Sequence, residues 1–104
     1  NTSTSAGNTV TLTGPVIISG PVDIDTDTTG ADGTVQFTST IVGDGAAGTT
    51  DNLIIDSGGS SITFGGTIGV AAPIAGFDVN QDGGTVALSI PQIGTAGANA
   101  GTSG

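Results

Sequence analysis

Apolar and polar residues alternate along this chain in a pattern that occurs four times. The copies read NTVTLTGPV, GTVQFTSTI, SSITFGGTI and GTVALSIPQI, and they begin at Asn8, Gly33, Ser60 and Gly84. Their starts are 25, 27 and 24 residues apart. A near-constant period of this length is typical of proteins built from stacked structural repeats.

When the four copies are aligned, their apolar residues fall into three columns. The first column holds Val10, Val35, Ile62 and Val86, the second holds Leu12, Phe37, Phe64 and Leu88, and the third holds Val16, Ile41, Ile68 and Ile93, the last displaced by one residue. Between the first two columns stand Thr11, Gln36, Thr63 and Ala87. Because side chains alternate between the two faces of a strand, this order predicts half-buried strands in which like residues stack on like.

No segment has a sustained helical period, so we predict an all-β fold. The predicted strands are residues 9–13, 16–19, 22–26, 34–41, 52–56, 61–68, 76–81 and 85–93. The segments between them are rich in Gly and Asp-Gly, which is typical of turns, because Gly adopts positive φ without steric cost and Asp bonds its local backbone.

A second motif follows the first at a variable distance. It reads VDIDTD from Val22, LIIDSG from Leu53 and FDVNQD from Phe77. Strands that keep their pattern while the connections vary are typical of solenoids, in which insertions extend from the corners. We therefore predict one all-β module over residues 1–104, a solenoid of about four coils, with residues 1–8 and 95–104 as low-complexity connecting segments.

The same strands also fit a different architecture. An antiparallel β-sandwich, as in a pilin-like subunit, would polymerise by donating residues 1–13 or the C-terminal run to the next subunit. Strand direction separates the two architectures. Parallel pairing of Val35 with Ile62 favours the solenoid, and antiparallel pairing favours the sandwich.

The charged residues exclude several classes of function. The chain has nine Asp and no Glu, Lys, Arg, His or Cys, so its formal net charge is −9. Without a cation it cannot neutralise phosphates, which predicts neither nucleic acid nor an anionic membrane surface as a partner, and no segment is apolar enough to insert into a membrane. Without the usual general bases and activated nucleophiles, we predict that it is not an enzyme.

Three segments resemble a known family. TVQFTSTI, NLIIDSGGSSITFGGTIG and GGTVALSIPQIG are similar to the repeats of giant β-strand-repeat surface proteins and filamentous-haemagglutinin-like adhesins of Gram-negative bacteria, over roughly residues 9–94. The resemblance implies a right-handed parallel β-helix and a secreted or surface-attached fibre. We expect an extracellular or cell-surface structural subunit whose partners are copies of itself. The absence of Lys and Arg also suits that location, because trypsin-like proteases cleave after these two residues. The Asp-rich corner at residues 23–32 and the absence of Lys and Arg depart from the family.

Two Asp-rich segments are the candidates for ligand binding. Asp at alternate positions followed by Gly offers several oxygens, and Ca²⁺ takes six to eight of them. The candidate calcium ligands are Asp23, Asp25, Asp27, Asp32, Asp78, Asn80 and Asp82. Neither segment is an EF-hand, because the twelfth position is Thr34 in one and Ser89 in the other. The alternative is that these residues form Asx-turns at exposed corners.

Stacked repeats would place Asp25, Asp56 and Asn80 in one column, with carboxylates close together and no cation to relieve them. A third interpretation of the chain is thus a calcium- or carbohydrate-binding module of a larger adhesin, with surface glycans as the partner. Phe37 and Phe64 are the aromatic candidates for a glycan platform, but their alternation with polar residues predicts that they stack in the core.

Overall fold

The computed structural model describes residues 2–3, 9–46, 50–80 and 90–94. These residues form nine strands and no helix, which confirms the all-β prediction. The strands are β1 (Thr2–Ser3), β2 (Val10–Leu12), β3 (Val16–Ile18), β4 (Val22–Asp25), β5 (Val35–Phe37), β6 (Ile41–Gly43), β7 (Asn52–Asp56), β8 (Ile62–Phe64) and β9 (Gly76–Asn80).

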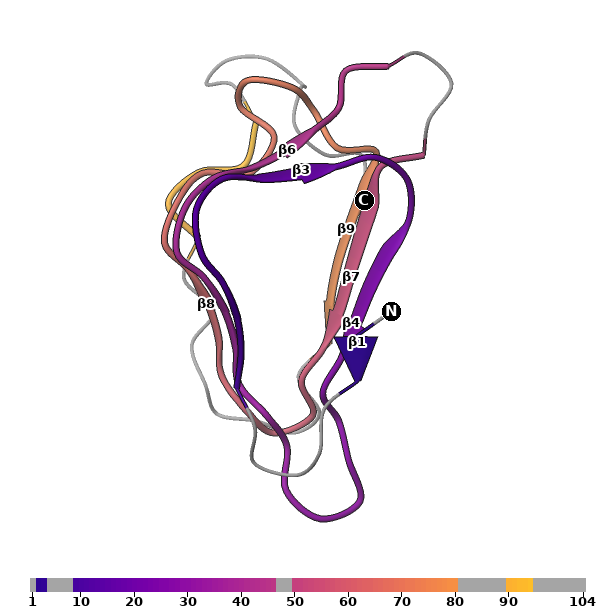
Figure 1. The fold of residues 1–104 in the computed structure, drawn as a ribbon, viewed down its shortest axis with the longest axis vertical. Coiled ribbons are helices and arrows are strands. Elements are labelled where there is room, and N and C mark those ends of the chain that lie inside the picture. Colours follow the sequence, from indigo (N-terminus) through magenta and orange to yellow (C-terminus); the bar gives the residue numbers. More distant parts are fainter. Residues whose placement is uncertain (1, 4–8, 47–49, 81–89, 95–104) are drawn as a thin grey trace.

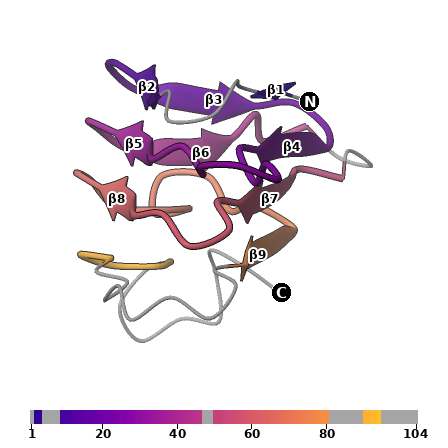
Figure 2. The ribbon, with the colours of Figure 1, turned by 90° about the horizontal axis from the view of Figure 1, so that it is seen from below.

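The strands form three parallel sheets. The largest contains β1, β4, β7 and β9 in that order, the second contains β2, β5 and β8, and the third contains β3 and β6. Figure 1 shows the sheets as three sides of a roughly triangular outline, and Figure 2 shows their strands one above another. Every pairing between the described strands is parallel, so these strands do not form the antiparallel sandwich.

The chain visits the three sheets in a fixed order. It passes through β2, β3 and β4, then through β5, β6 and β7, and then through β8, the bridge residue Ile68 and β9. We call each such passage a circuit. Because every circuit adds one strand or bridge to each sheet, residues about 25 positions apart in the sequence become neighbours in space.

The strand register confirms the predicted apolar columns. Val10 pairs with Val35 and Val35 with Ile62, and Leu12, Phe37 and Phe64 pair in the same way. The third column runs from Val16 through Ile41 and Ile68 to Ile93, so Ile93 keeps its place in the column despite its one-residue displacement in the sequence. The predicted column members Val86, Ala87 and Leu88 lie outside the described residues.

The apolar columns point into the space between the sheets and form the core. Phe37 and Phe64 are 2% and 4% exposed, and their rings stack with centroids 5.4 Å apart and planes at 6°. Phe77, on the partly buried inner side of β9, packs edge-on against Phe64, with ring centroids 5.6 Å apart. The prediction of a core stack is therefore confirmed, and these rings offer no exposed platform to a glycan.

The strands differ from the predicted limits at the corners. Residues 34–41, predicted as one strand, are divided into β5 and the start of β6, and residues 61–68 are divided into β8 and Ile68. The dividing residues are polar or Gly, so no apolar side chain holds them in either sheet. Strand β1 was missed because it lies in a segment of small, mostly polar residues. Residues 81–89, which include most of the last predicted strand, are outside the described residues.

One corner is packed too closely for any side chain. A Cβ on Gly66 would lie 2.6 Å from the carbonyl carbon of Ser39 and 2.7 Å from the backbone nitrogen of Thr40, in the circuit before it. A Cβ on Gly65 would lie 2.8 Å from the carbonyl oxygen of Thr38. Gly is therefore required here because backbone lies directly on backbone.

We expect Gly66→Ala to lower the free energy of unfolding by about 1–3 kcal/mol, because the added methyl group must push two circuits apart. Thermal unfolding followed by circular dichroism measures the effect. Gly59→Ala is the matched control, since a Cβ there would meet only the side-chain Oδ2 of Asp32, at 3.3 Å. Equal midpoints for the two variants would contradict the close contact at Gly66.

Candidate functional site

The outer face of the largest sheet carries most of the predicted ligands. Side chains alternate along its strands, so Ile24, Ile55 and Val79 face the core while the residues between them, most of them polar, face outward. The outward residues are Asp23 and Asp25 on β4, Asn52, Ile54 and Asp56 on β7, and Gly76, Asp78 and Asn80 on β9. This face is acidic, and exposed Ile54 lies in register between Asp23 and Asp78.

The predicted column of Asp25, Asp56 and Asn80 is present in register at the ends of three neighbouring strands. Oδ1 of Asp25 accepts the backbone N–H of Asp27 at 3.0 Å, and Oδ1 of Asp56 accepts that of Gly58 at 3.1 Å. Both contacts join residues two apart and are Asx-turns, the alternative that the sequence suggested. Nδ2 of Asn80 donates to Oδ2 of Asp56 at 2.9 Å, so an amide relieves one carboxylate where no cation exists.

Asp32 connects two successive circuits. Its Oδ2 accepts the backbone N–H of Gly59 at 2.7 Å, its Oδ1 accepts that of Thr28 at 3.3 Å, and its own carbonyl accepts the hydroxyl of Ser60 at 2.8 Å. The amides of Gly59 and Thr28 hold the pKa of Asp32 below its usual value, because they stabilise the ionised carboxylate. Both carboxylate oxygens are thus already bonded to the backbone.

Asp51 was not predicted as a functional residue, yet it is the most buried of the described carboxylates. It is 5% exposed, its Oδ1 accepts the backbone N–H of Gly20 at 2.9 Å, and its Oδ2 accepts that of Asp44 at 3.2 Å. It therefore fastens the corner between β6 and β7 to the circuit before it. The only sequence signal was its position directly before a strand, with Asp44 directly after the preceding one.

A calcium centre would need several of these oxygens to converge. Among the described residues, no group of three or more acidic side chains is arranged to hold a metal ion. Asp82 lies outside the described residues. Calcium binding by Asp23, Asp25, Asp27, Asp32, Asp78, Asn80 and Asp82 therefore stays a prediction, whereas the backbone contacts of Asp25 and Asp32 are those of turn-forming residues.

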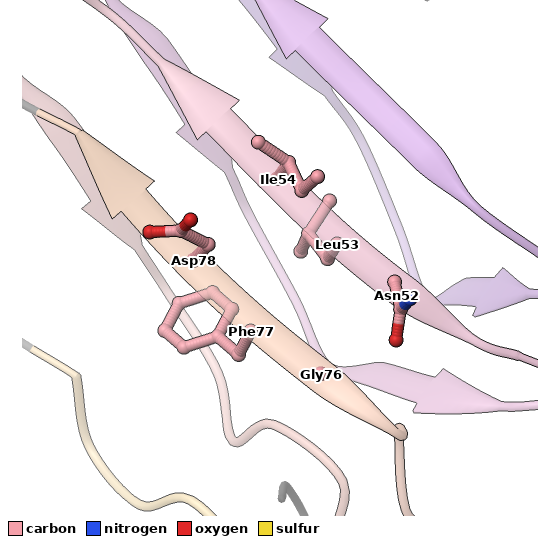
Figure 3. A pocket seen from close by; sticks show the side chains of 6 residues that line it. All are labelled: Asn52, Leu53, Ile54, Gly76, Phe77 and Asp78. Atoms are coloured by element: carbon pink, nitrogen blue, oxygen red, sulfur yellow. The ribbon is translucent and has the colours of Figure 1, made fainter. Parts of the chain in front are cut away.

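A shallow groove of about 420 Å³ runs between β7 and β9, lined by Asn52, Leu53, Ile54, Gly76, Phe77 and Asp78 (Figure 3). Gly76 carries no side chain beside Asn52, whose Oδ1 lies only 2.7 Å from where a Cβ would be. The lining is largely apolar and contains one carboxylate. It holds no pair of titratable groups suited to acid–base chemistry.

We expect Asp51→Ala to lower the free energy of unfolding by about 1–3 kcal/mol, because two backbone N–H groups lose their acceptor at a partly buried corner. Urea denaturation measures the loss. Asp51→Asn, which keeps one side-chain oxygen as an acceptor, is the matched control and should retain part of the stability. Equal stability of the Ala and Asn variants would contradict this role of the Asp51 carboxylate.

The lowered pKa of Asp32 predicts a dependence of stability on pH. The unfolded carboxyl titrates near its ordinary value of 3.8 and the folded one below it, so the stabilisation is complete above that value and is lost as pH falls through the folded pKa. The difference in unfolding free energy between the native chain and Asp32→Asn should therefore be largest at neutral pH and shrink on acidification. For Thr63→Ala, an uncharged change on the exposed side of β8, the difference should not vary with pH, and the same constancy for Asp32→Asn would refute the prediction.

Comparisons with known proteins do not extend this description. No family model matches the chain, and neither a curated protein nor a solved structure does so. In the part of the chain that the structure describes, no helix is long and apolar enough to cross a membrane. The function has to be inferred from the sheets and corners themselves.

Proposed function

We propose that this chain is a structural module of an extracellular or cell-surface fibre, built as a right-handed parallel β-helix that assembles by stacking of strands. The observation that carries the proposal is the parallel, in-register column of Val16, Ile41, Ile68 and Ile93 through successive circuits. Its function in this view is mechanical: it provides length and resistance, and its partners are copies of itself.

The hydrogen bonds between circuits support this proposal. The N–H of Val10 donates to the carbonyl of Thr34 at 2.8 Å, and that of Val35 donates to Ser61 at 3.0 Å, one circuit further on. Each circuit therefore satisfies the backbone of its neighbour in the same way. A structure of this kind has no internal reason to stop after any given circuit, because the next one meets the same donors and acceptors.

The first circuit has strands whose outer edges are unpaired in the described part of the molecule. β2 has only β5 as its neighbour, and β3 has only β6. An edge strand offers a row of backbone groups to another chain, and proteins that remain monomeric usually block such edges with charge, Pro or a covering segment. Val10 and Leu12 at this edge are only partly buried, whereas their partners Val35 and Phe37 are buried.

The composition supports a structural role over a catalytic one. The chain carries no Lys, Arg, His, Cys or Glu, and the described carboxylates of Asp25, Asp32, Asp51 and Asp56 bind backbone amides. The net charge of −9 keeps the surface hydrated. We propose an extracellular location on the resemblance to bacterial surface fibres and on the absence of Lys and Arg.

The purified chain should form thin, unbranched filaments as its concentration rises, with a spacing of about 4.8 Å along the filament axis in fibre diffraction. Circular dichroism at low concentration should already show β-structure, which separates assembly of folded modules from aggregation of unfolded chains. Electron microscopy provides the direct test. A chain that stays monomeric at every concentration, or beaded filaments in which a terminal strand is exchanged, would refute the proposal.

A further inference from the structure

We propose that copies of this chain join head to tail through one defined register, in which Ile93 of one copy stacks on Val16 of the next. This inference rests on the proposed function and adds to it the residues that meet. The third apolar column ends in these two residues, and both the burial and the hydrogen bonds of that column indicate what each end lacks.

Burial along the column depends on having a circuit on each side. Ile41 and Ile68, in the middle of the column, are 1% and 0% exposed. Ile93 at one end is 40% exposed, and Val16 at the other end is only partly buried. Since the four side chains are similar and stand in one register, the missing neighbour accounts for the exposure at both ends.

The hydrogen bonds of the column follow one rule. The N–H of Val16 donates to the carbonyl of Thr40 at 2.8 Å, and the N–H of Ile41 donates to the carbonyl of Thr67 at 3.0 Å. Each column residue therefore donates to the residue that precedes its partner in the next circuit. The same rule holds for the N–H of Ile68, which donates to the carbonyl of Gln92 at 2.8 Å.

Applied once more, the rule defines the contact between copies. The N–H of Ile93 would donate to the carbonyl of Pro15 in the next copy. The carbonyl of Ile68 accepts the N–H of Gly94 at 2.7 Å, so by the same rule the carbonyl of Ile93 would accept the N–H of Ile17 in the next copy. In a parallel ladder alternate residues bond to opposite neighbours, which directs the backbone groups of Ile17 away from β6 and toward this junction.

The composition of the two ends suits such a contact. Pro15 keeps its carbonyl as an acceptor and has no N–H, a residue that sheets accept at an edge. Pro15, Val16, Ile17, Gln92 and Ile93 carry no charge, whereas four carboxylates point outward from the largest sheet. Contact between the sides of two copies would bring these carboxylates together without a cation, whereas the third apolar column meets its partner through uncharged residues.

The two ends are different surfaces, so the contact does not close on itself. An interface between unlike surfaces continues into a filament unless the rotation between copies brings the chain back to its start. A stack that adds each copy further along one axis cannot return to its start, whatever the rotation between copies. The proposed register therefore leads to an open fibre with two distinguishable ends.

Disulfide cross-linking tests the register, because the chain has no Cys of its own. In the proposed contact Pro15 of one copy lies beside Gln92 of another at one strand spacing, about 4.8 Å between Cα atoms, within the range that a disulfide spans. Both residues are exposed. The double variant Pro15→Cys, Gln92→Cys should yield, on oxidation, covalent trimers and longer species that reducing agent dissolves, and each single variant should yield nothing beyond a dimer.

The matched control pairs Pro15→Cys with Ile54→Cys, which places an exposed thiol at the centre of the largest sheet instead of at an end. It should not give the covalent series. If filaments form but the Pro15, Gln92 pair does not cross-link, or cross-links no better than the control, the register is wrong while the proposed function stands. If neither filaments nor covalent species form, both are wrong, as they would be if this chain's own residues 95–104 covered Ile93.

A charge at the junction provides a second test. Ile93→Asp should raise the lowest concentration at which filaments form by about tenfold or more, because the carboxylate would lose its water in the contact. Ile17→Asp is the matched control. Ile17 directly follows Val16 on β3, but its side chain is 68% exposed and points away from the core. Its effect should be several-fold smaller, while both variants keep the circular dichroism spectrum of the native chain. Equal inhibition by the two variants would overturn the proposed role of Ile93.

Discussion

Hydrogen bonding between parallel strands of successive circuits is the interaction on which the rest of this structure depends. A chain with 20 Gly and three aromatic residues has little apolar surface with which to form a conventional core. Here the apolar residues need only fill the narrow space between three sheets, because the backbone of each circuit is held by its neighbour. The column of Ile41 and Ile68 is fully buried with one side chain per circuit. Regular hydrogen bonding between circuits thus compensates for the small apolar surface that this chain can bury.

The sequence predicted this arrangement in the strands, where the repeat and the alternation of side chains determine which residues pair. The pairing of Val10 with Val35 and of Phe37 with Phe64 followed from the repeat and the two-residue side-chain period, and the column of Asp25, Asp56 and Asn80 followed from the second motif. Repetition makes such predictions possible, since an error in one copy would conflict with the others. Strand direction could not be deduced from alternation, because parallel and antiparallel strands have the same side-chain period.

The corners could not be predicted in the same way. Gly66 lies against the backbone of Ser39 because of the path of another circuit, and nothing in its own neighbourhood distinguishes it from the turn glycines. Asp51 accepts hydrogen bonds from the backbone of Gly20 and Asp44, which belong to different circuits. Asp32 was predicted as a metal ligand from its acidic segment, and nothing in that segment indicated that the amide of Gly59, 27 residues later, binds its carboxylate. A carboxylate that bonds to distant backbone is indistinguishable in sequence from one that awaits a cation.

The spacing of the circuits gives the nine Asp residues a collective property. In a continuous stack each circuit advances one strand spacing, about 4.8 Å, so nine charges over about four circuits amount to roughly one negative charge for every 2 Å of length. Duplex DNA carries one per about 1.7 Å and condenses counterions along its whole length. A fibre of this chain would be a polyelectrolyte of similar line charge. Dissolved cations would gather around it as a diffuse sheath without any one carboxylate having to serve as a binding site.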